Sequence, residues 1–168
     1  KKVGLKDTEG LEILNASISK KNNYYFEFLY KKLNRKGFLE RDCQRLVNQD
    51  RNIFAACMVA NGDADGMVTG STRNFFVAYD DITKVIDPAP KSRIFGLSII
   101  MFEGRTLFIA DTTVHYMPSS EELADIACQT ADIAKKLGHN PRVAMLSFAN
   151  FGNPEIKGAE RVHDAIEV

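Results

Sequence analysis

The segment Asp87-Pro88-Ala89-Pro90 constrains the fold more than any other part of the sequence. Proline lacks a backbone N–H and clashes with the preceding turn, so two prolines this close together cannot lie inside a helix. The pattern before this segment is mainly helical, whereas Ile94 to Phe102 is rich in β-branched and aromatic residues, as strands are. We therefore expect a boundary here, between residues 1–90 and residues 91–168.

Apolar residues at helical spacing dominate the part before the boundary. Tyr25, Leu29 and Leu33 recur every four residues, which places them on one helix face, and Gly37 is a typical helix stop. The elements expected in this part are a short strand at Leu11–Leu14 and helices over Asn22–Lys36, Glu40–Gly62 (with a candidate break at Asn48–Arg51) and Ser71–Ile86.

Strand and helix patterns alternate after the boundary. Glu103-Gly104 joins two strand candidates by a tight turn, which predicts an antiparallel hairpin. Ser119 followed by Glu122 is the pattern of a capping box at the start of a helix. This alternation indicates an α/β fold, mostly parallel, with one antiparallel hairpin. The elements expected here are strands over Ile94–Phe102, Thr106–Ala110 and Arg142–Phe148, and helices from Ser119 to Lys136 and over Gly158–Val168.

Charge and composition exclude several classes of protein. Lys plus Arg and Asp plus Glu both number 22, and zero net charge argues against a general nucleic-acid binder. No apolar run approaches the roughly 20 residues that span a bilayer, and Lys1–Lys6 has no signal-peptide core, so we expect a cytoplasmic protein without a membrane partner. Three widely spaced cysteines predict reduced thiols, with Cys43 and Cys57 buried.

The segment Gly62–Gly70 is the first candidate binding site. Its glycines allow a close backbone approach, and free N–H groups in such a loop suit a phosphate or pyrophosphate. It lacks the patterns of a Walker loop, a dinucleotide fingerprint and an EF-hand, and a turn that merely needs glycine dihedrals explains it equally well. Asp63 and Asp65 share one face of an extended segment, where they could bind a ligand or cap backbone amides.

Polar residues at strand ends form the second candidate. Asp111-Thr112 follows a strand directly, and Ser147 lies near the end of another, where ligands of α/β proteins bind. Caps and turns would explain each residue taken alone. The three histidines show no metal-ligand spacing, so we expect no metal site in this chain.

Several stretches together carry a family resemblance. Gly62-Asp63-Ala64-Asp65-Gly66-Met67-Val68-Thr69-Gly70, Phe108-Ile109-Ala110-Asp111-Thr112-Thr113-Val114, Pro118 to Ala127 and Arg142 to Phe148 resemble, in this order, the phosphate acetyl/butyryl transferase family. Arg41-Asp42, Asn48 to Asn52, Thr72-Arg73-Asn74 and Val114 to Pro118 are similar, more narrowly, to the transferase-like C-terminal region of large bacterial NADP-dependent malic enzymes.

This resemblance implies a two-lobed fold with a mostly parallel, three-layer sheet, of which residues 1–90 would form part of the first lobe and residues 91–168 part of the second. It implies a cleft for acetyl-CoA, CoA or an acyl phosphate, a homo-oligomer, and a missing N-terminal malic-enzyme part that holds the NADP, metal and malate sites. Arg73 would contact phosphate, and the other implied contacts are Asp63, Asp65, Gly66, Thr69, Gly70, Asp111, Thr112 and Ser147.

Two departures from the transferase pattern bear on activity. The chain has no Asp-Leu-Ser-Arg-Gly-like stretch, and Asp80 lies near the place of an arginine, where an acid would repel phosphate. We therefore expect no catalytic residue in this chain and a regulatory domain that senses acetyl-CoA for a fused malic enzyme. Acyl transfer between CoA and phosphate is the alternative, and a scaffold for oligomerisation, suggested by the aromatic stretch Asn23–Phe28, is a third.

Overall fold

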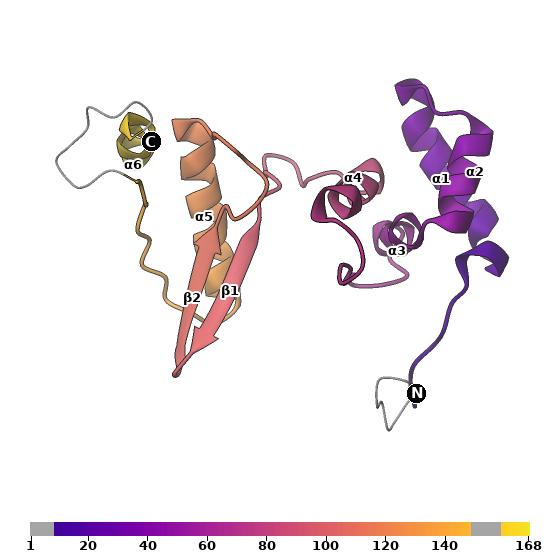
Figure 1. The fold of residues 1–168 in the computed structure, drawn as a ribbon, viewed down its shortest axis with the longest axis horizontal. Helices are drawn as coiled ribbons and strands as arrows, with labels where there is room; N and C mark the ends of the chain where they lie inside the picture. The colour runs from indigo at the N-terminus through magenta and orange to yellow at the C-terminus, as the bar shows by residue number, and fades with distance from the viewer. Residues whose placement is uncertain (1–8, 149–158) are drawn as a thin grey trace. The chain divides into compact units, whose positions relative to one another are not determined.

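The computed structural model describes residues 9–148 and 159–168. The chain divides into two compact units, Lys1–Asp87 and Pro88–Val168 (Figure 1). The boundary expected after residue 90 lies close to this division. Within the described residues, no helix is both long and apolar enough to cross a membrane.

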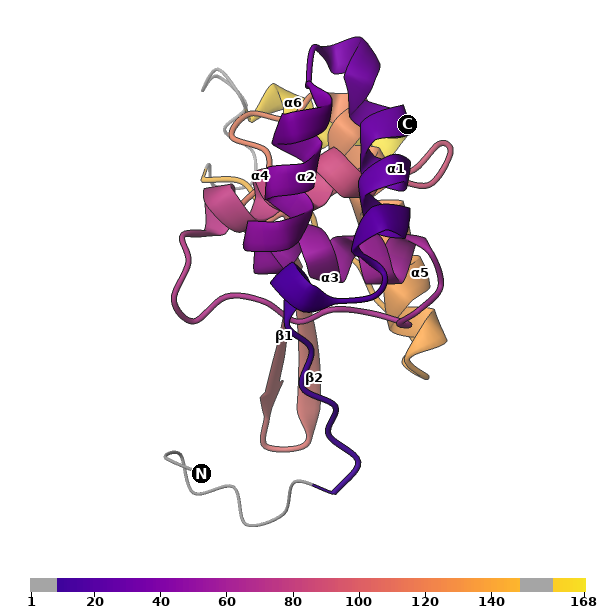
Figure 2. The ribbon, with the colours of Figure 1, turned by 90° about the vertical axis from the view of Figure 1, so that its right-hand side faces the viewer.

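The first unit is helical. Its elements are the 3₁₀ helices η1 (Ala16–Ile18) and η2 (Asn34–Lys36) and the α-helices α1 (Asn22–Leu33), α2 (Glu40–Gln49), α3 (Arg51–Ala60) and α4 (Phe75–Val85). Helices α1 and α2 lie side by side, and α4 packs against α3 (Figure 2). The helix expected over Ser71–Ile86 begins only at Phe75, because Asn74 caps it by accepting the N–H of Phe76 at 2.9 Å.

Asp50 divides the long helical stretch expected over Glu40–Gly62 into α2 and α3, which confirms the candidate break. Its backbone N–H donates to Leu46 in the last turn of α2. Its side-chain Oδ1 accepts the N–H groups of Asn52 and Ile53 at 2.8 and 3.2 Å, so the same residue caps the start of α3. The capped junction fixes the direction in which α3 leaves α2.

The core of the first unit lies between α1, α2 and α3. The helical face predicted for α1 is confirmed, since Tyr25, Leu29 and Leu33 are fully buried. The Tyr25 ring meets that of Phe54 edge to face, with centroids 5.2 Å apart. Both predicted cysteines are buried free thiols, and burial raises the pKa of Cys57 to about 12. The buried cluster consists of Tyr25, Leu29, Leu33, Cys43, Val47, Ile53, Phe54, Ala56, Cys57 and Val85.

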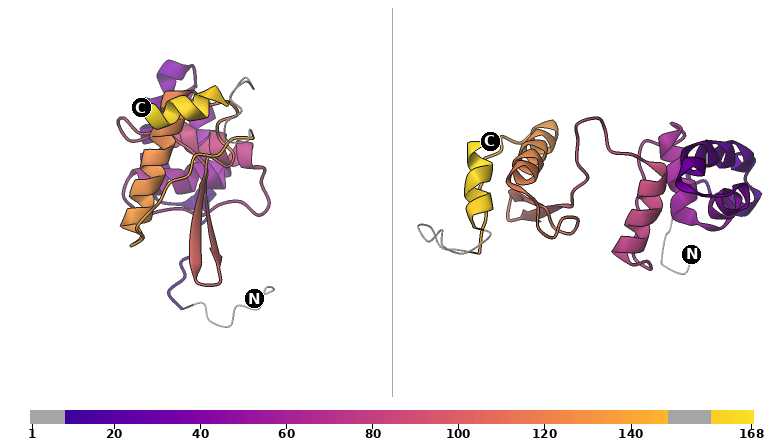
Figure 3. Two further views of the ribbon diagram at one scale, coloured as in Figure 1. Left: turned by 90° about the vertical axis from the view of Figure 1, so that its left-hand side faces the viewer. Right: turned by 90° about the horizontal axis from the view of Figure 1, so that it is seen from above.

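The second unit contains a hairpin and two helices, namely β1 (Leu97–Phe102), β2 (Arg105–Ala110), α5 (Ser120–Lys136) and α6 (Glu160–Glu167). The predicted hairpin is confirmed as antiparallel, and positive φ angles at Glu103 and Gly104 form its turn. The capping box is confirmed too, since Ser119 Oγ accepts the N–H of Glu122 and Glu122 accepts that of Ser119. Helix α5 lies along β2, and α6 packs on α5 (Figure 3).

Two predicted strands are absent from the described residues. Leu11–Leu14 is exposed and has no regular structure. Arg142–Phe148, expected as a buried strand, pairs with no strand, and Val143, Leu146 and Phe148 are 57%, 83% and 73% exposed. A strand needs a neighbour to satisfy its backbone, and the only ladder in 9–148 and 159–168 joins β1 to β2. The fold is therefore α/β, while a parallel, three-layer sheet stays a prediction.

Gly96, just before β1, generates a prediction about stability. A Cβ added there would lie 2.6 Å from Thr113 Oγ1 and 2.8 Å from Thr112 Oγ1, closer than real contacts allow. Gly96→Ala should therefore lower the free energy of unfolding by about 1–3 kcal/mol, measured by chemical denaturation. Gly66→Ala is the control, because its Cβ would enter open space, and it should stay within about 0.5 kcal/mol of the parent. Equal stability of the two variants would contradict the prediction.

Candidate functional site

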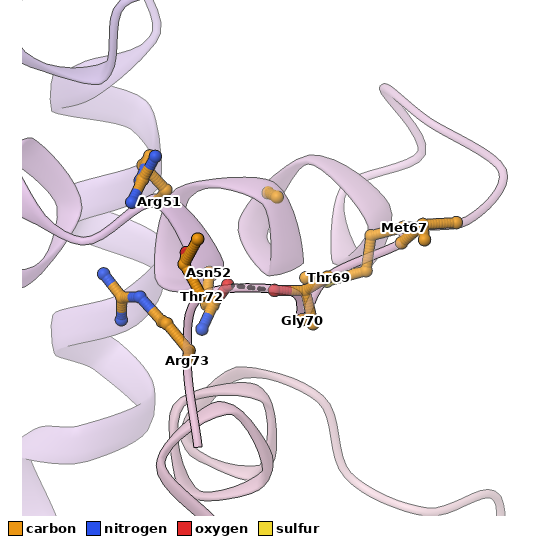
Figure 4. Close-up of a pocket in the computed structure, with 9 residues that line it drawn as sticks. Arg51, Asn52, Met67, Thr69, Gly70, Thr72 and Arg73 are labelled. Carbon is orange, nitrogen blue, oxygen red and sulfur yellow. Dashed lines mark hydrogen bonds between the residues drawn. The ribbon is translucent and has the colours of Figure 1, made fainter. Parts of the chain in front are cut away.

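The glycine-rich loop and the start of α3 enclose a hollow, which we call the loop hollow. Its volume is about 320 Å³, near the lower end of the roughly 300–1,000 Å³ of ligand pockets. In Figure 4, Met67 lies away from the two arginines that line the hollow. The lining residues are Arg51, Asn52, Ala55, Met67, Val68, Thr69, Gly70, Thr72 and Arg73.

Asp63 anchors the beginning of the loop to α1. Its carboxylate accepts hydrogen bonds from Lys21 Nζ and, at 2.6 Å, from the Tyr25 hydroxyl. The hydrogen bond from Lys21, followed by that from Tyr25, holds the pKa of Asp63 below its usual value. Burial and the same hydrogen bond raise the pKa of Tyr25. Asp63 is therefore committed to holding the loop and does not line the hollow.

Asn52 links the end of the loop to two helices. Thr69 Oγ1 donates to Asn52 Oδ1 at 2.6 Å, which Figure 4 marks, and Asn52 Nδ2 donates to Asp81 Oδ2 at 3.2 Å. Asn52 and Asp81 are only 4% and 7% exposed. A buried side-chain hydrogen bond of this kind defines the position of Thr69 relative to α3 and α4.

Arg73 lies between the carboxylates of Asp50 and Asp81, and we call these three residues the arginine clamp. Its Nη1 donates to Asp50 Oδ2 at 2.6 Å and to Asp81 Oδ2 at 3.1 Å. Burial by itself would raise the pKa of Asp50, but the hydrogen bond from Arg73 and those from the N–H groups of Ile53 and Asn52 hold it below its usual value. A phosphate at Arg73 would have to compete with both carboxylates.

The loop backbone offers unpaired donors. Within the described part of the chain, the N–H groups of Gly66 through Ser71 have no hydrogen-bond partner. Gly70 and Ser71 both have positive φ angles, 126° and 64°, and the N–H of Thr72 turns back to the Gly70 carbonyl at 2.7 Å. Unpaired amides beside the Thr72 hydroxyl and an arginine suit an anion.

Asp111 organises a second cluster, in the other unit. Its carboxylate accepts four backbone N–H groups, those of Gly96, Thr113, Val114 and His115, at 2.8–3.1 Å, and contacts His115 Nδ1 at 2.6 Å. Burial alone would raise the pKa of Asp111, but these hydrogen bonds hold it well below its usual value. The carboxylate is used within the protein, so Asp111 shapes the turn after β2.

The structure brings together only some of the predicted site residues. Thr69, Gly70 and Arg73 line the loop hollow, whereas Asp65 and Gly66 belong to the same loop but not to the lining. The three remaining residues, Asp111, Thr112 and Ser147, lie in the second unit, where the Thr112 N–H donates to the Gly96 carbonyl at 3.1 Å and Ser147 is in the extended segment after α5. Contact of all these residues with one ligand stays a prediction.

Sequence reasoning missed several residues of the site. Arg51 and Asn52 lie at the start of α3, at the expected break in the helical stretch, and that expectation said nothing about a hollow. Asp81 is one helical position from the acid noted at Asp80, and only the tertiary structure shows that it faces Arg73. Within residues 9–148 and 159–168, no three His, Cys, Asp or Glu side chains are placed to hold a metal ion.

Comparison with known proteins places this geometry in context. The family model for Phosphate acetyl/butaryl transferase matches residues 1–168. The NADP-dependent malic enzyme of Rhizobium meliloti (strain 1021) is 55% identical over 162 residues, and the phosphate acetyltransferase of Clostridium acetobutylicum is 32% identical over 171 residues. A solved phosphotransacetylase from Streptococcus pyogenes superposes with a TM-score of 0.83 at 28% identity.

The chain corresponds to a part of each of these proteins. The alignments cover 96%, 96% and 99% of this chain, respectively. They cover 21% of the malic enzyme, 51% of the acetyltransferase and 50% of the solved phosphotransacetylase.

The arginine clamp generates a second prediction. Arg73→Gln leaves the nearly buried Asp81 carboxylate without its arginine and should lower the free energy of unfolding by about 1–3 kcal/mol. Lys135→Gln removes the exposed ion pair with Asp132 and, as the control, should cost less than about 1 kcal/mol. Urea denaturation measures both, and an equal loss in the two variants would show that the clamp contributes no more than a surface pair.

The third prediction concerns pH and Asp111. Because its folded pKa is lowered, its contribution to stability is complete above the unfolded value near 4 and is lost as pH falls below it. Asp111→Asn should lower the free energy of unfolding at pH 7 by about 1–3 kcal/mol, and its difference from the parent should shrink below pH ~4. Denaturation at pH 7 and pH 3 tests this, with the exposed Asp132→Asn as control. A difference independent of pH would contradict it.

Proposed function

The chain belongs to the Phosphate acetyl/butaryl transferase family, and from that premise we propose that it is the transferase-like regulatory domain of a bacterial NADP-dependent malic enzyme. In this proposal the whole protein converts malate to pyruvate by oxidative decarboxylation, and the NADP, metal and malate sites belong to its malic-enzyme part. The domain binds acetyl-CoA as an effector.

The observation that carries the proposal is the high identity with two malic enzymes, 55% and 46%, although other malic enzymes are only 27–28% identical. Identity is 55% with a malic enzyme and 32% with a phosphate acetyltransferase. The alignment takes up about a fifth of the malic enzyme, which leaves most of that protein for other domains. A domain with the transferase fold, joined to an enzyme of another chemistry, has the arrangement expected of a sensor.

The loop hollow supports acetyl-CoA as the effector. It combines unpaired amides, the Thr72 hydroxyl and arginine, which suit phosphate, with the apolar side chains of Met67 and Val68. Acetyl-CoA regulates the whole enzyme only if it binds two states of that enzyme unequally, and coupling of this kind typically changes affinity by about 5- to 150-fold.

Acyl transfer is the less favoured alternative. Transfer between CoA and phosphate needs positive charge around the acyl phosphate. In this chain Asp80, near the place of the transferase arginine, is exposed and pairs with Lys84 at 2.5 Å, while the carboxylates of the clamp compensate Arg73. These features put acidic side chains where a transferase needs positively charged ones, and they favour binding of the ligand without its turnover.

The proposal is tested on the full-length protein with three measurements. Calorimetry should show saturable binding of acetyl-CoA, malate-dependent NADPH formation should change as acetyl-CoA is added, and acetyl phosphate plus CoA should give no thioester. Thioester formation at catalytic rates would replace the sensor by a transferase. Absence of binding up to millimolar acetyl-CoA would overturn the proposal and leave the scaffold role, to be examined by light scattering.

A further inference from the structure

We propose that Arg51 is the residue through which the loop hollow binds a phosphate group of its acyl-CoA effector, and that Arg73 only positions the loop. This inference rests on the proposed function, since it names a contact of the same ligand. It reverses the expectation that Arg73 contacts phosphate, and it assigns a role to a residue that was not among the expected ligand contacts.

The charges of the two arginines carry the argument. Arg73 and Arg51 are the cations that line the hollow. Arg73 donates to two carboxylates, Asp50 and Asp81, of which Asp81 also pairs with Lys84, so its positive charge is compensated. Arg51 is exposed, and no residue in the described part of the chain forms a hydrogen bond or ion pair with its side chain. A guanidinium stays charged at any physiological pH, so Arg51 supplies uncompensated positive charge to the hollow.

The surroundings of Arg51 complete a set of donors. The lining contains no carboxylate, because Asp50 and Asp81 face Arg73 and stay outside it. The unpaired N–H groups of Thr69 and Gly70 lie in the same lining, as does the Thr72 hydroxyl, for which the described residues provide no partner. A planar guanidinium with nearby amide and hydroxyl donors matches the tetrahedral oxygens of a phosphate.

The clamp explains why the hollow keeps this shape. Asp50 caps α3, whose first residue is Arg51. The same carboxylate of Asp50 accepts a hydrogen bond from Arg73, which follows the loop. The start of α3 and the end of the loop, both of which line the hollow, are thus connected through one aspartate. Because such donors are already ordered, binding an anion costs them little conformational entropy.

The size of the hollow limits what it holds. At about 320 Å³ it is near the lower end of ligand pockets, so it accommodates one group of a long effector. CoA carries phosphate in two places, a pyrophosphate and a phosphate on the ribose. Both present the same chemistry to Arg51, and ligands that lack one or all of them distinguish the two sources.

The test uses the full-length protein and three ligands: acetyl-CoA, acetyl-dephospho-CoA without the ribose phosphate, and acetylpantetheine without any phosphate. Binding is measured by calorimetry for the parent, for Arg51→Gln, and for a control, Arg41→Gln, which removes an exposed arginine of α2 outside the hollow. Arg51→Gln should weaken acetyl-CoA binding by about 10- to 100-fold, and Arg41→Gln by less than about twofold.

The ligand series separates phosphate recognition from other effects. The loss in Arg51→Gln should vanish with acetylpantetheine. If it persists with acetyl-dephospho-CoA, Arg51 contacts the pyrophosphate, and if it vanishes there too, Arg51 contacts the ribose phosphate. Arg51→Lys should restore part of the affinity, since it keeps the charge but loses the planar fork.

Failure of this inference is distinguishable from failure of the proposed function. If the parent binds acetyl-CoA and Arg51→Gln binds it equally well, the role of Arg51 is wrong and the sensor proposal stands. A loss of equal size for acetyl-CoA and acetylpantetheine would likewise overturn the phosphate contact. If the parent binds none of the three ligands, both proposals fall.

Discussion

The ion cluster of Asp50, Arg73 and Asp81 is the interaction on which the first unit depends. Asp50 ends α2 and caps α3, Asp81 belongs to α4, and Arg73 lies in the loop between α3 and α4. One guanidinium therefore connects a helix junction, a loop and a helix. Because Asp81 is almost completely buried, the cluster tolerates little rearrangement, and the glycine-rich loop acquires a definite path although its own backbone is largely unpaired.

This constraint also divides the work between the two arginines. A charge that two carboxylates hold in place is suited to structure, whereas a charge exposed beside unpaired amides is suited to binding. A charged group with a structural role is found in the second unit too, where the Asp111 carboxylate accepts hydrogen bonds from four backbone N–H groups. Asp63 and Asp111, two of the acidic residues that drew attention in the sequence, thus use their carboxylates in contacts within the protein.

Exposed apolar surface in the second unit is consistent with a chain that corresponds to half of a solved relative. Ile100, Phe102 and Leu107 share one face of the β1–β2 hairpin and are all exposed, as are Val143, Leu146 and Phe148. Surface of this kind is normally covered in a finished fold. The solved phosphotransacetylase is about twice as long, so a complete fold of this type has further residues with which to cover it.

Sequence alone determined the features that depend on neighbours along the chain: the break in the helical stretch near Asp50, the capping box at Ser119, the buried face of α1, the hairpin turn at Glu103-Gly104, and, through the order of motifs, the family. Strand assignment failed at Arg142–Phe148, because a strand exists only when another strand pairs with it. Tertiary structure alone decided which arginine is compensated, since Asp50, Arg73 and Asp81 are separated in sequence and meet only when α3 and α4 pack. Charge pairing between distant segments leaves no periodic signal, and for that reason the sequence did not reveal that Arg73 pairs with two carboxylates while Arg51 has no such partner among the described residues.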